Sequence, residues 1–138
     1  MYKNKQFKKL ERKYSEYQDS GSVGFFMNIC HKNLEVDIKN DAIEKRKKKI
    51  LEIGAGTSPH ISYLNDNYEK YFFLENSKFS IKHLKKRFKK NKKIHYKLYS
   101  GKNIPFKANY FDRVIISHVL EHIPYPENFI EEMMKKLK

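Results

Sequence analysis

From about residue 49 onward, short apolar runs alternate with segments whose apolar residues recur every three or four positions. The apolar runs predict β-strands, and the periodic segments predict helices. Four strands are expected, at KILEI, KYFFLE, IHYKLYS and RVIIS. Helices are expected between and after them, at SPHISYLNDN, SKFSIKHLKKRFKKN and YPENFIEEMMKKLK. Strands that alternate with helices through short connections are typical of a doubly wound, parallel α/β sheet.

The ends of these helices carry recognisable signals. Ser58 is a candidate N-cap with Pro59 at the first helical position, and Ser77 is a candidate N-cap for the next helix. RVIIS is apolar with almost no alternation, as expected of a central strand buried on both faces. The stretch GKNIPFKANY before it is predicted to be a loop. The last helix is expected to turn four apolar residues inward: Phe129, Ile130, Met133 and Leu137.

The first 45 residues have a different pattern. Residues 1–20 are charged with spaced aromatic and leucine side chains, which suits an amphipathic helix or a frayed arm. Gly21 and Gly24 are expected to break this segment. A packed helix is predicted over FFMNICHKNLEVDI, with one apolar face made of Phe25, Phe26, Ile29, Cys30 and Leu34. We therefore expect an N-terminal helical extension over 1–45 and an α/β domain over 46–138.

Composition narrows the classes of protein to consider. A chain of 138 residues has room for one core, and its formal net charge of +14 attracts anions such as nucleic acid. Lysine occurs almost throughout the chain, which favours diffuse charge over a dedicated nucleic-acid surface. Cys30 is the single cysteine, and no pair among His31, His60, His83 and His95 has metal-ligand spacing, so no metal site is predicted. Without a signal peptide or an apolar span, we expect a soluble, cytoplasmic protein.

The stretch LEIGAGTSPH, residues 51–60, contains the strongest chemical signal. It resembles a strand followed by a ligand-binding glycine turn, but Pro59 stands where the dinucleotide fingerprint G-x-G-x-x-G has its third glycine. The phosphate-binding Gly-Lys-Ser/Thr sequence is absent as well. Glu52 precedes Gly54 and Gly56, and a carboxylate there favours a ligand that carries cationic groups. S-adenosylmethionine carries a sulfonium and an ammonium group. A simpler interpretation, an ordinary strand-to-helix turn in which Glu52 binds its own backbone, stays open.

A second carboxylate lies at the expected distance along the chain. Glu75 ends the second predicted strand, 21 residues after Gly54, close to the spacing of about 20 residues at which an acidic side chain reaches a ribose diol. Two acceptor oxygens suit two neighbouring hydroxyls. A simpler interpretation, in which Glu75 only caps the next helix, stays open.

Together these residues resemble the class I S-adenosylmethionine-dependent methyltransferases of the type 11 kind, from about Lys49 to Lys138. The resemblance is carried by LEIGAGTS, by FFLENS and above all by IPFKANYFDRVIISHVLEHIPYPENFIEEMMKKLK. It implies a Rossmann-like sheet whose strand order begins 3-2-1-4, with the cofactor across the carboxyl ends of the strands. It also implies eight cofactor-binding residues: Glu52, Gly54, Gly56, Glu75, Asn76, Ser100, Ser117 and His118. Ser100 departs from the family pattern, which has an acidic residue there.

Methyl transfer from a sulfonium mainly requires that donor and acceptor are brought together. If the acceptor must lose a proton, His118 is the candidate general base, although HVLEH can equally serve to shape the pocket. We expect a small-molecule or glycan-type acceptor. An RNA methyltransferase and a cofactor-binding remnant without activity remain alternatives, and a dehydrogenase is disfavoured by Pro59.

The family pattern continues beyond the helix at which this sequence ends. The resemblance therefore implies that the C-terminal strands are missing and that the fourth strand is an exposed edge. Such an edge is open to an oligomer contact or to a partner protein.

Overall fold

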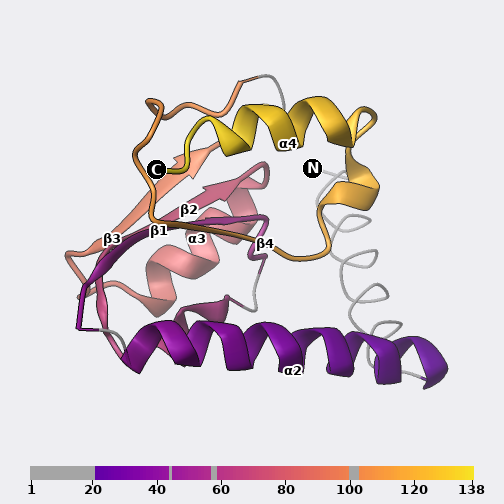
Figure 1. Ribbon diagram of the computed structural model, residues 1–138, viewed down its shortest axis with the longest axis horizontal. Coiled ribbons are helices and arrows are strands. Elements are labelled where there is room, and N and C mark those ends of the chain that lie inside the picture. Colours follow the sequence, from indigo (N-terminus) through magenta and orange to yellow (C-terminus); the bar gives the residue numbers. More distant parts are fainter. Residues whose placement is uncertain (1–20, 44, 57–58, 100–102) are drawn as a thin grey trace, which may run out of the picture. The chain divides into compact units, whose positions relative to one another are not determined.

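The computed structural model describes most of the chain, namely residues 21–43, 45–56, 59–99 and 103–138. The chain divides into two compact units, Met1–Ile38 and Lys39–Lys138. The whole β-sheet lies in the second unit (Figure 1). No helix in the described part is long and apolar enough to cross a membrane.

The sheet has four parallel strands in the order β3-β2-β1-β4, as the sequence predicted. Their bounds are β1 Lys48–Ile53, β2 Tyr68–Glu75, β3 Ile94–Leu98 and β4 Arg113–Ile116. At the carboxyl end of β1, Ile53 pairs with Leu74 of β2 and with Ile116 of β4. The residues after these three strands therefore leave the sheet at the same edge. In the described sheet β4 is the outer strand, and only Ile115 of its residues is fully buried.

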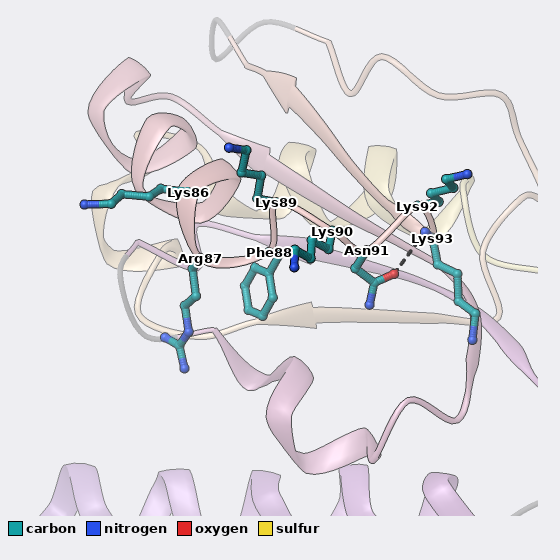
Figure 2. Close-up of a pocket in the computed structure, with 8 residues that line it drawn as sticks. All are labelled: Lys86, Arg87, Phe88, Lys89, Lys90, Asn91, Lys92 and Lys93. Atoms are coloured by element: carbon teal, nitrogen blue, oxygen red, sulfur yellow. Dashed lines mark hydrogen bonds between the residues drawn. The ribbon is translucent and has the colours of Figure 1, made fainter.

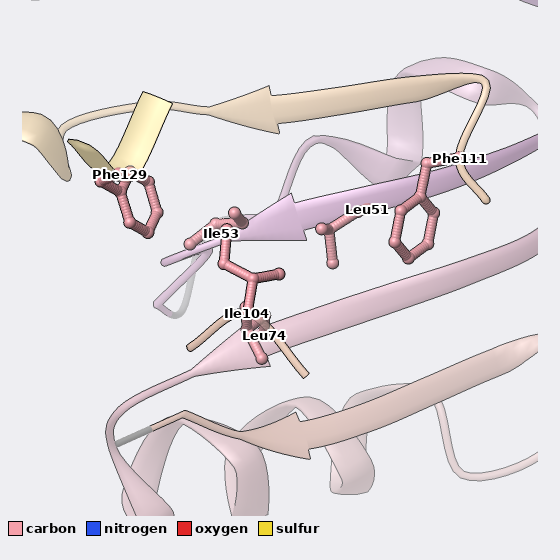
Figure 3. Close-up of a cluster of buried hydrophobic side chains, with 6 residues drawn as sticks. All are labelled: Leu51, Ile53, Leu74, Ile104, Phe111 and Phe129. Carbon is pink, nitrogen blue, oxygen red and sulfur yellow. The ribbon is translucent and has the colours of Figure 1, made fainter. Parts of the chain in front are cut away.

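One face of the sheet packs against the last helix and the segment before β4. Helix α4, Pro126–Met134, lies over this face (Figure 1). The core here consists of six buried side chains, drawn in Figure 3: Leu51, Ile53, Leu74, Ile104, Phe111 and Phe129. Residues 103–110 form neither helix nor strand, which confirms the predicted loop for that part.

Helix α3, Lys78–Arg87, packs on the other side of β2 and β3. The Ser77 hydroxyl accepts a hydrogen bond from the Ser80 amide at 3.3 Å, which confirms the predicted N-cap. Leu84 is fully buried, and Phe88 stacks on Phe73 of β2 with ring centroids 5.9 Å apart.

The expected helix after β1 is a single short 3-10 helix, η1, His60–Leu64, so that prediction is wrong in kind and length. Pro59 occupies the N-cap and is not the first helical residue, and Ser58 lies outside the described residues. Asn65 and Asp66 both have positive φ, of 46° and 60°. Two successive left-handed residues end the helix after one turn, since an α-helix cannot continue through them.

Two further predictions about helices are wrong. Helix α2, Gly21–Ile43, runs through Gly24, where a break was expected, and in it Ile29 and Cys30 are exposed although both were predicted to pack inward. In α4, Phe129 is buried as predicted, but Ile130 is 39% exposed. Met133 and Leu137, also predicted to point inward, are half-buried.

Candidate functional site at the carboxyl edge of the sheet

The glycine turn begins directly at the end of β1. The Gly54 amide donates to the Leu74 carbonyl at 3.0 Å and so extends the pairing of β1 with β2. Gly54 has a φ of 71°, and a Cβ placed on it would lie 2.3 Å from Cγ2 of Val119. Both the backbone angle and the contact exclude a side chain here. The contact also shows that the segment after β4 lies directly on the glycine turn.

Gly56 has a left-handed backbone like Gly54, but no side chain packs against it. Its φ is 57°, and a Cβ built on it would meet no atom within 4 Å. The backbone at Gly56 therefore borders open space, which gives a ligand close access to the main chain. The Gly56 amide donates to Oε1 of Glu75 at 2.7 Å, so the glycine turn is tied to the end of β2.

Glu75 is a buried carboxyl group hydrogen-bonded to the glycine turn. It is 3% exposed, and within the described residues only its Oε1 atom has a hydrogen-bond partner. Burial raises the pKa of Glu75 to about 7, the Gly56 amide opposes this rise, and the charge of Glu52 adds to it. A buried carboxylate with a free oxygen is costly unless a ligand supplies donors. Glu75 is therefore suited to accept hydrogen bonds from hydroxyl groups.

Glu52 is a buried carboxylate at the carboxyl end of β1. It is 1% exposed, and both of its carboxylate oxygens are taken up by protein groups. The Tyr71 hydroxyl donates to Oε2 at 2.6 Å, the His60 amide donates to Oε1 at 3.1 Å, and the His60 ring nitrogen Nδ1 lies 2.7 Å from that same oxygen. Glu52 thus links the start of η1, just beyond the glycine turn, to the two central strands.

Sequence reasoning missed His60, Tyr71 and Val119 as parts of this site. One signal was present for Tyr71, because strand residues alternate and Tyr71 lies on the same face of β2 as Glu75. A buried tyrosine hydroxyl requires a hydrogen-bond partner, and Glu52 on the neighbouring strand is the acidic group within reach. Nothing in the sequence pointed to the packing of Val119 on Gly54.

Ser117 and His118 come directly after β4, next to the glycine turn. Both are half-buried, and His118 has a positive φ of 55°, which is uncommon for a residue other than glycine. The Nδ1 atom of His118 lies 3.9 Å from Oε1 of Glu121 in the following 3-10 helix η2, Leu120–His122. A left-handed residue at the end of a strand turns the chain sharply, and here the next residue, Val119, is brought onto Gly54.

The remaining candidates are less well defined by the structure. Asn76 directly follows Glu75 and is exposed at the same edge of the sheet. Ser100 lies outside the described residues, but Tyr99 just before it donates its amide to the Glu75 carbonyl at 2.6 Å. The structure thus brings together Gly54, Gly56 and Glu75 directly, and places the end of β4 beside them.

This edge combines a backbone that borders open space at Gly56 with the carboxyl group of Glu75, whose second oxygen has no partner among the described residues. The methyltransferase-domain family matches residues 51–138, which is the greater part of the chain and includes every group described above. The chain belongs to this family. No curated protein matches the chain by sequence.

Solved structures of methyltransferases have the same fold as this family member. The trans-methyltransferase CalH, solved in complex with S-adenosylhomocysteine, matches with a TM-score of 0.65 and 24% identity over 75% of this chain. A methyltransferase from Aquifex aeolicus, described as dependent on S-adenosylmethionine, matches with a TM-score of 0.64 and 16% identity over 75% of this chain.

The same fold also carries other chemistry. The [4+2]-cyclase SpnF matches with a TM-score of 0.64 and 17% identity over 77% of this chain. This chain spans 33% of the length of CalH, 58% of the Aquifex protein and 40% of SpnF. It therefore corresponds to about a third to just over a half of these proteins, and such similarity establishes the fold and not the reaction.

Proposed function

We propose that this methyltransferase-domain chain binds S-adenosylmethionine across the carboxyl ends of β1, β2 and β4 and transfers its methyl group to a small-molecule or glycan-type acceptor. The observation that carries the proposal is Glu75, a buried carboxyl group with one oxygen on the Gly56 amide and the other without a partner in the described residues. The ribose of the cofactor has two neighbouring hydroxyls that suit this group.

The neighbouring residues support the same arrangement. The open space beside Gly56 lets the methionine part of the cofactor lie along the main chain. Asn76 follows Glu75 and is placed to border the adenine, while Ser117 and His118 border the methionine end. Glu52 is fully engaged by His60 and Tyr71, so we assign it to holding the turn in shape and not to direct contact with the cofactor.

The bound cofactor would supply an electrophilic methyl group with a good leaving group. The protein then has to orient an acceptor in line with that methyl and exclude water. His118 is the residue best placed to remove a proton from a hydroxyl or amine acceptor, because it lies at the end of β4 beside the glycine turn. We therefore assign it the role of general base.

The charge of the segment that runs from β4 to the end of α4 favours a small acceptor over a nucleic acid. Residues 114–134, which run from β4 through η2 and α4, contain no lysine or arginine and four glutamates: Glu121, Glu127, Glu131 and Glu132. A polyphosphate substrate would be repelled by such a segment, whereas a neutral or cationic small molecule would not.

Calorimetric titration of the purified chain with S-adenosylmethionine, S-adenosylhomocysteine and NAD tests the cofactor assignment. We expect the first two to bind and NAD not to bind. Glu75→Ala should weaken binding by about 1–3 kcal/mol, since a charged hydrogen bond is lost. Glu69→Ala is the matched control, because Glu69 lies at the other end of the same strand and is exposed. A folded, monodisperse sample that binds neither sulfur compound would contradict the proposal.

The acceptor class requires a separate measurement. Transfer of a radiolabelled methyl group is followed with pooled phenols, amines and sugars in one arm and with mixed-sequence RNA in the other. We expect label in the small-molecule arm only. Label in RNA would support the alternative of an RNA methyltransferase, and binding of the cofactor without transfer to any acceptor would identify a cofactor-binding domain without activity of its own.

A further inference from the structure

The positive charge of this chain is concentrated in one segment. Residues 76–111 contain 12 of the 30 lysines and arginines and none of the 16 acidic residues. The rest of the chain, with 18 basic and 16 acidic residues, is nearly balanced. Basic residues occur outside this segment as well, but acidic residues nearly balance them there. Almost all of the net charge of +14 belongs to α3, β3 and the segments beside them.

Within this segment the charge is densest between Lys85 and Lys93, where seven of nine residues are basic. These residues end α3 and form the turn into β3. Because α3 begins after the carboxyl end of β2 and leads to the amino end of β3, this turn lies at the opposite edge of the sheet from Glu75. We call residues 85–93 the basic turn.

The basic turn forms an open hollow of about 720 Å³ that is lined by residues 86–93. Figure 2 shows that its charged side chains spread from the turn in several directions and do not converge on one point. Four of them are exposed and have no carboxylate partner among the described residues: Lys86, Lys89, Lys90 and Lys92. The repulsion between these four positive charges is therefore reduced by solvent or by a bound anion.

The backbone that presents these charges is held in place by hydrogen bonds. Asn91 accepts from the Lys93 amide through Oδ1 at 3.0 Å and donates to the hydroxyl of the buried Tyr68 at 2.8 Å. The Tyr71 amide donates to the Lys93 carbonyl at 2.9 Å. A turn anchored in this way keeps its lysines at defined positions, although the side chains themselves are long and adaptable.

We propose that the basic turn is a docking surface for the sugar–phosphate backbone of single-stranded RNA, separate from the methyl-transfer site. Cations that diverge suit a ligand with many phosphates along a flexible chain, because a single phosphate would need convergent donors. A flat bilayer surface contacts only some of these diverging cations at a time. The one aromatic side chain of the hollow, Phe88, is stacked on Phe73 and is therefore not available for insertion into a bilayer.

The aromatic rings near the basic turn are already covered by its cations. Lys85 lies over Tyr96 at 5.8 Å from the ring centroid, and Lys93 lies over Tyr68 at 5.4 Å. These rings do not offer the open faces on which bases stack, so recognition is confined to phosphates and is independent of sequence. Because strands of five to eight residues separate the two edges, RNA at the basic turn positions the protein without placing a base at the reacting methyl.

The test is fluorescence anisotropy of a labelled 20-nucleotide oligouridine with the full chain at several salt concentrations. We expect affinity to fall steeply with salt, with a slope of about 0.7 per phosphate contact. Replacing Lys86, Lys89, Lys90 and Lys92 by Gln should weaken binding at least tenfold and reduce the salt slope by about 3. The matched control replaces four exposed lysines elsewhere by Gln: Lys32, Lys45, Lys47 and Lys70.

Both variants lose four charges, so the control should bind oligouridine almost as well as the original chain. Equal losses in the two variants would show that only the total charge matters and would overturn the proposal. So would absence of oligouridine binding at low salt, or binding to phosphatidylserine vesicles without binding to oligouridine. Circular dichroism and thermal melting of both variants verify that they are folded. Cofactor binding plays no part in the test.

Discussion

Oε1 of Glu75 lies 2.7 Å from the Gly56 amide that donates to it, and this bond joins the glycine turn after β1 to the end of β2, 19 residues further along the chain. The same carboxyl group is buried at 3% exposure and has a pKa raised to about 7, chiefly by burial. A group that titrates near neutral pH in the folded protein, and near 4.5 in the unfolded chain, links stability to pH in a defined direction.

The free protein should become less stable as pH rises from about 4.5 to 7. In that window folded Glu75 keeps its proton while the unfolded chain has lost it, so the folded state binds more protons and rising pH favours unfolding. The contribution of Glu75 should reach about 3 kcal/mol and then level off above pH 7. Urea unfolding at a series of pH values measures how the free energy of unfolding depends on pH. Glu75→Gln retains an acceptor for the Gly56 amide but should lack the pH dependence that Glu75 contributes.

Binding of S-adenosylmethionine should release a proton from Glu75. Hydroxyl donors stabilise the ionised carboxylate, so the cofactor lowers the pKa that burial has raised. Affinity should therefore rise with pH by up to tenfold per unit below about pH 7 and change little above it. Calorimetry at pH 6 in two buffers of different ionisation enthalpy reports the released proton. The same release in Glu75→Gln would show that another group is responsible.

The two glycines of the turn should respond differently to alanine. Gly54→Ala combines a left-handed backbone with the Cβ placed 2.3 Å from Val119, so we expect a loss of more than about 2 kcal/mol in stability. The double variant Gly54→Ala/Val119→Ala should regain part of the lost stability, because the clash with Val119 is removed. Gly56→Ala should cost only about 1 kcal/mol, since its Cβ meets nothing, yet it should abolish cofactor binding. Thermal melting and titration separate the two effects.

Tyr71→Phe should destabilise the protein by about 1–3 kcal/mol. The substitution removes the hydroxyl that donates to Oε2 of Glu52 and leaves this fully buried carboxylate oxygen with only the longer hydrogen bond from the His60 amide, at 3.3 Å. Tyr63→Phe is the control, because Tyr63 is only half-buried and its hydroxyl has no hydrogen-bond partner among the described residues. Equal stability of the two variants in urea would contradict the structural role assigned to Glu52.

The β-sheet was readable from the sequence because the strands are short runs rich in apolar and aromatic residues, and the glycine turn follows β1 directly. The position of Glu75 was also predictable, because it ends a strand and lies 21 residues after Gly54. The type and length of the helix after β1 could not be read from the sequence. A pattern with two inward residues, Ile61 and Leu64, fits a short 3-10 helix as well as several turns of α-helix.

The environment of Glu52 could not be predicted from spacing alone. Its partners come from η1 and from the neighbouring strand, so the pairing depends on strand register and on the course of the turn. A local sequence pattern contains no information on the strand register or on the course of the turn. The resemblance to methyltransferases predicts Glu52 as a cofactor-binding residue, whereas the hydrogen bonds of its carboxylate to His60 and Tyr71 become visible only in the structure.

His118→Asn provides a sharp test of the assigned base. Asparagine tolerates the left-handed backbone angle of 55°, so the fold and the position of Val119 should be retained. The imidazole is lost, and turnover should fall by about 10²- to 10⁴-fold if His118 removes a proton from the acceptor. The dissociation constant of S-adenosylmethionine should stay within a few-fold. His122→Asn, four residues further on in η2, is the control and should leave turnover nearly unchanged. If both variants turn over at the original rate, the acceptor does not lose its proton to His118, and the residue serves instead to turn the chain onto the glycine turn.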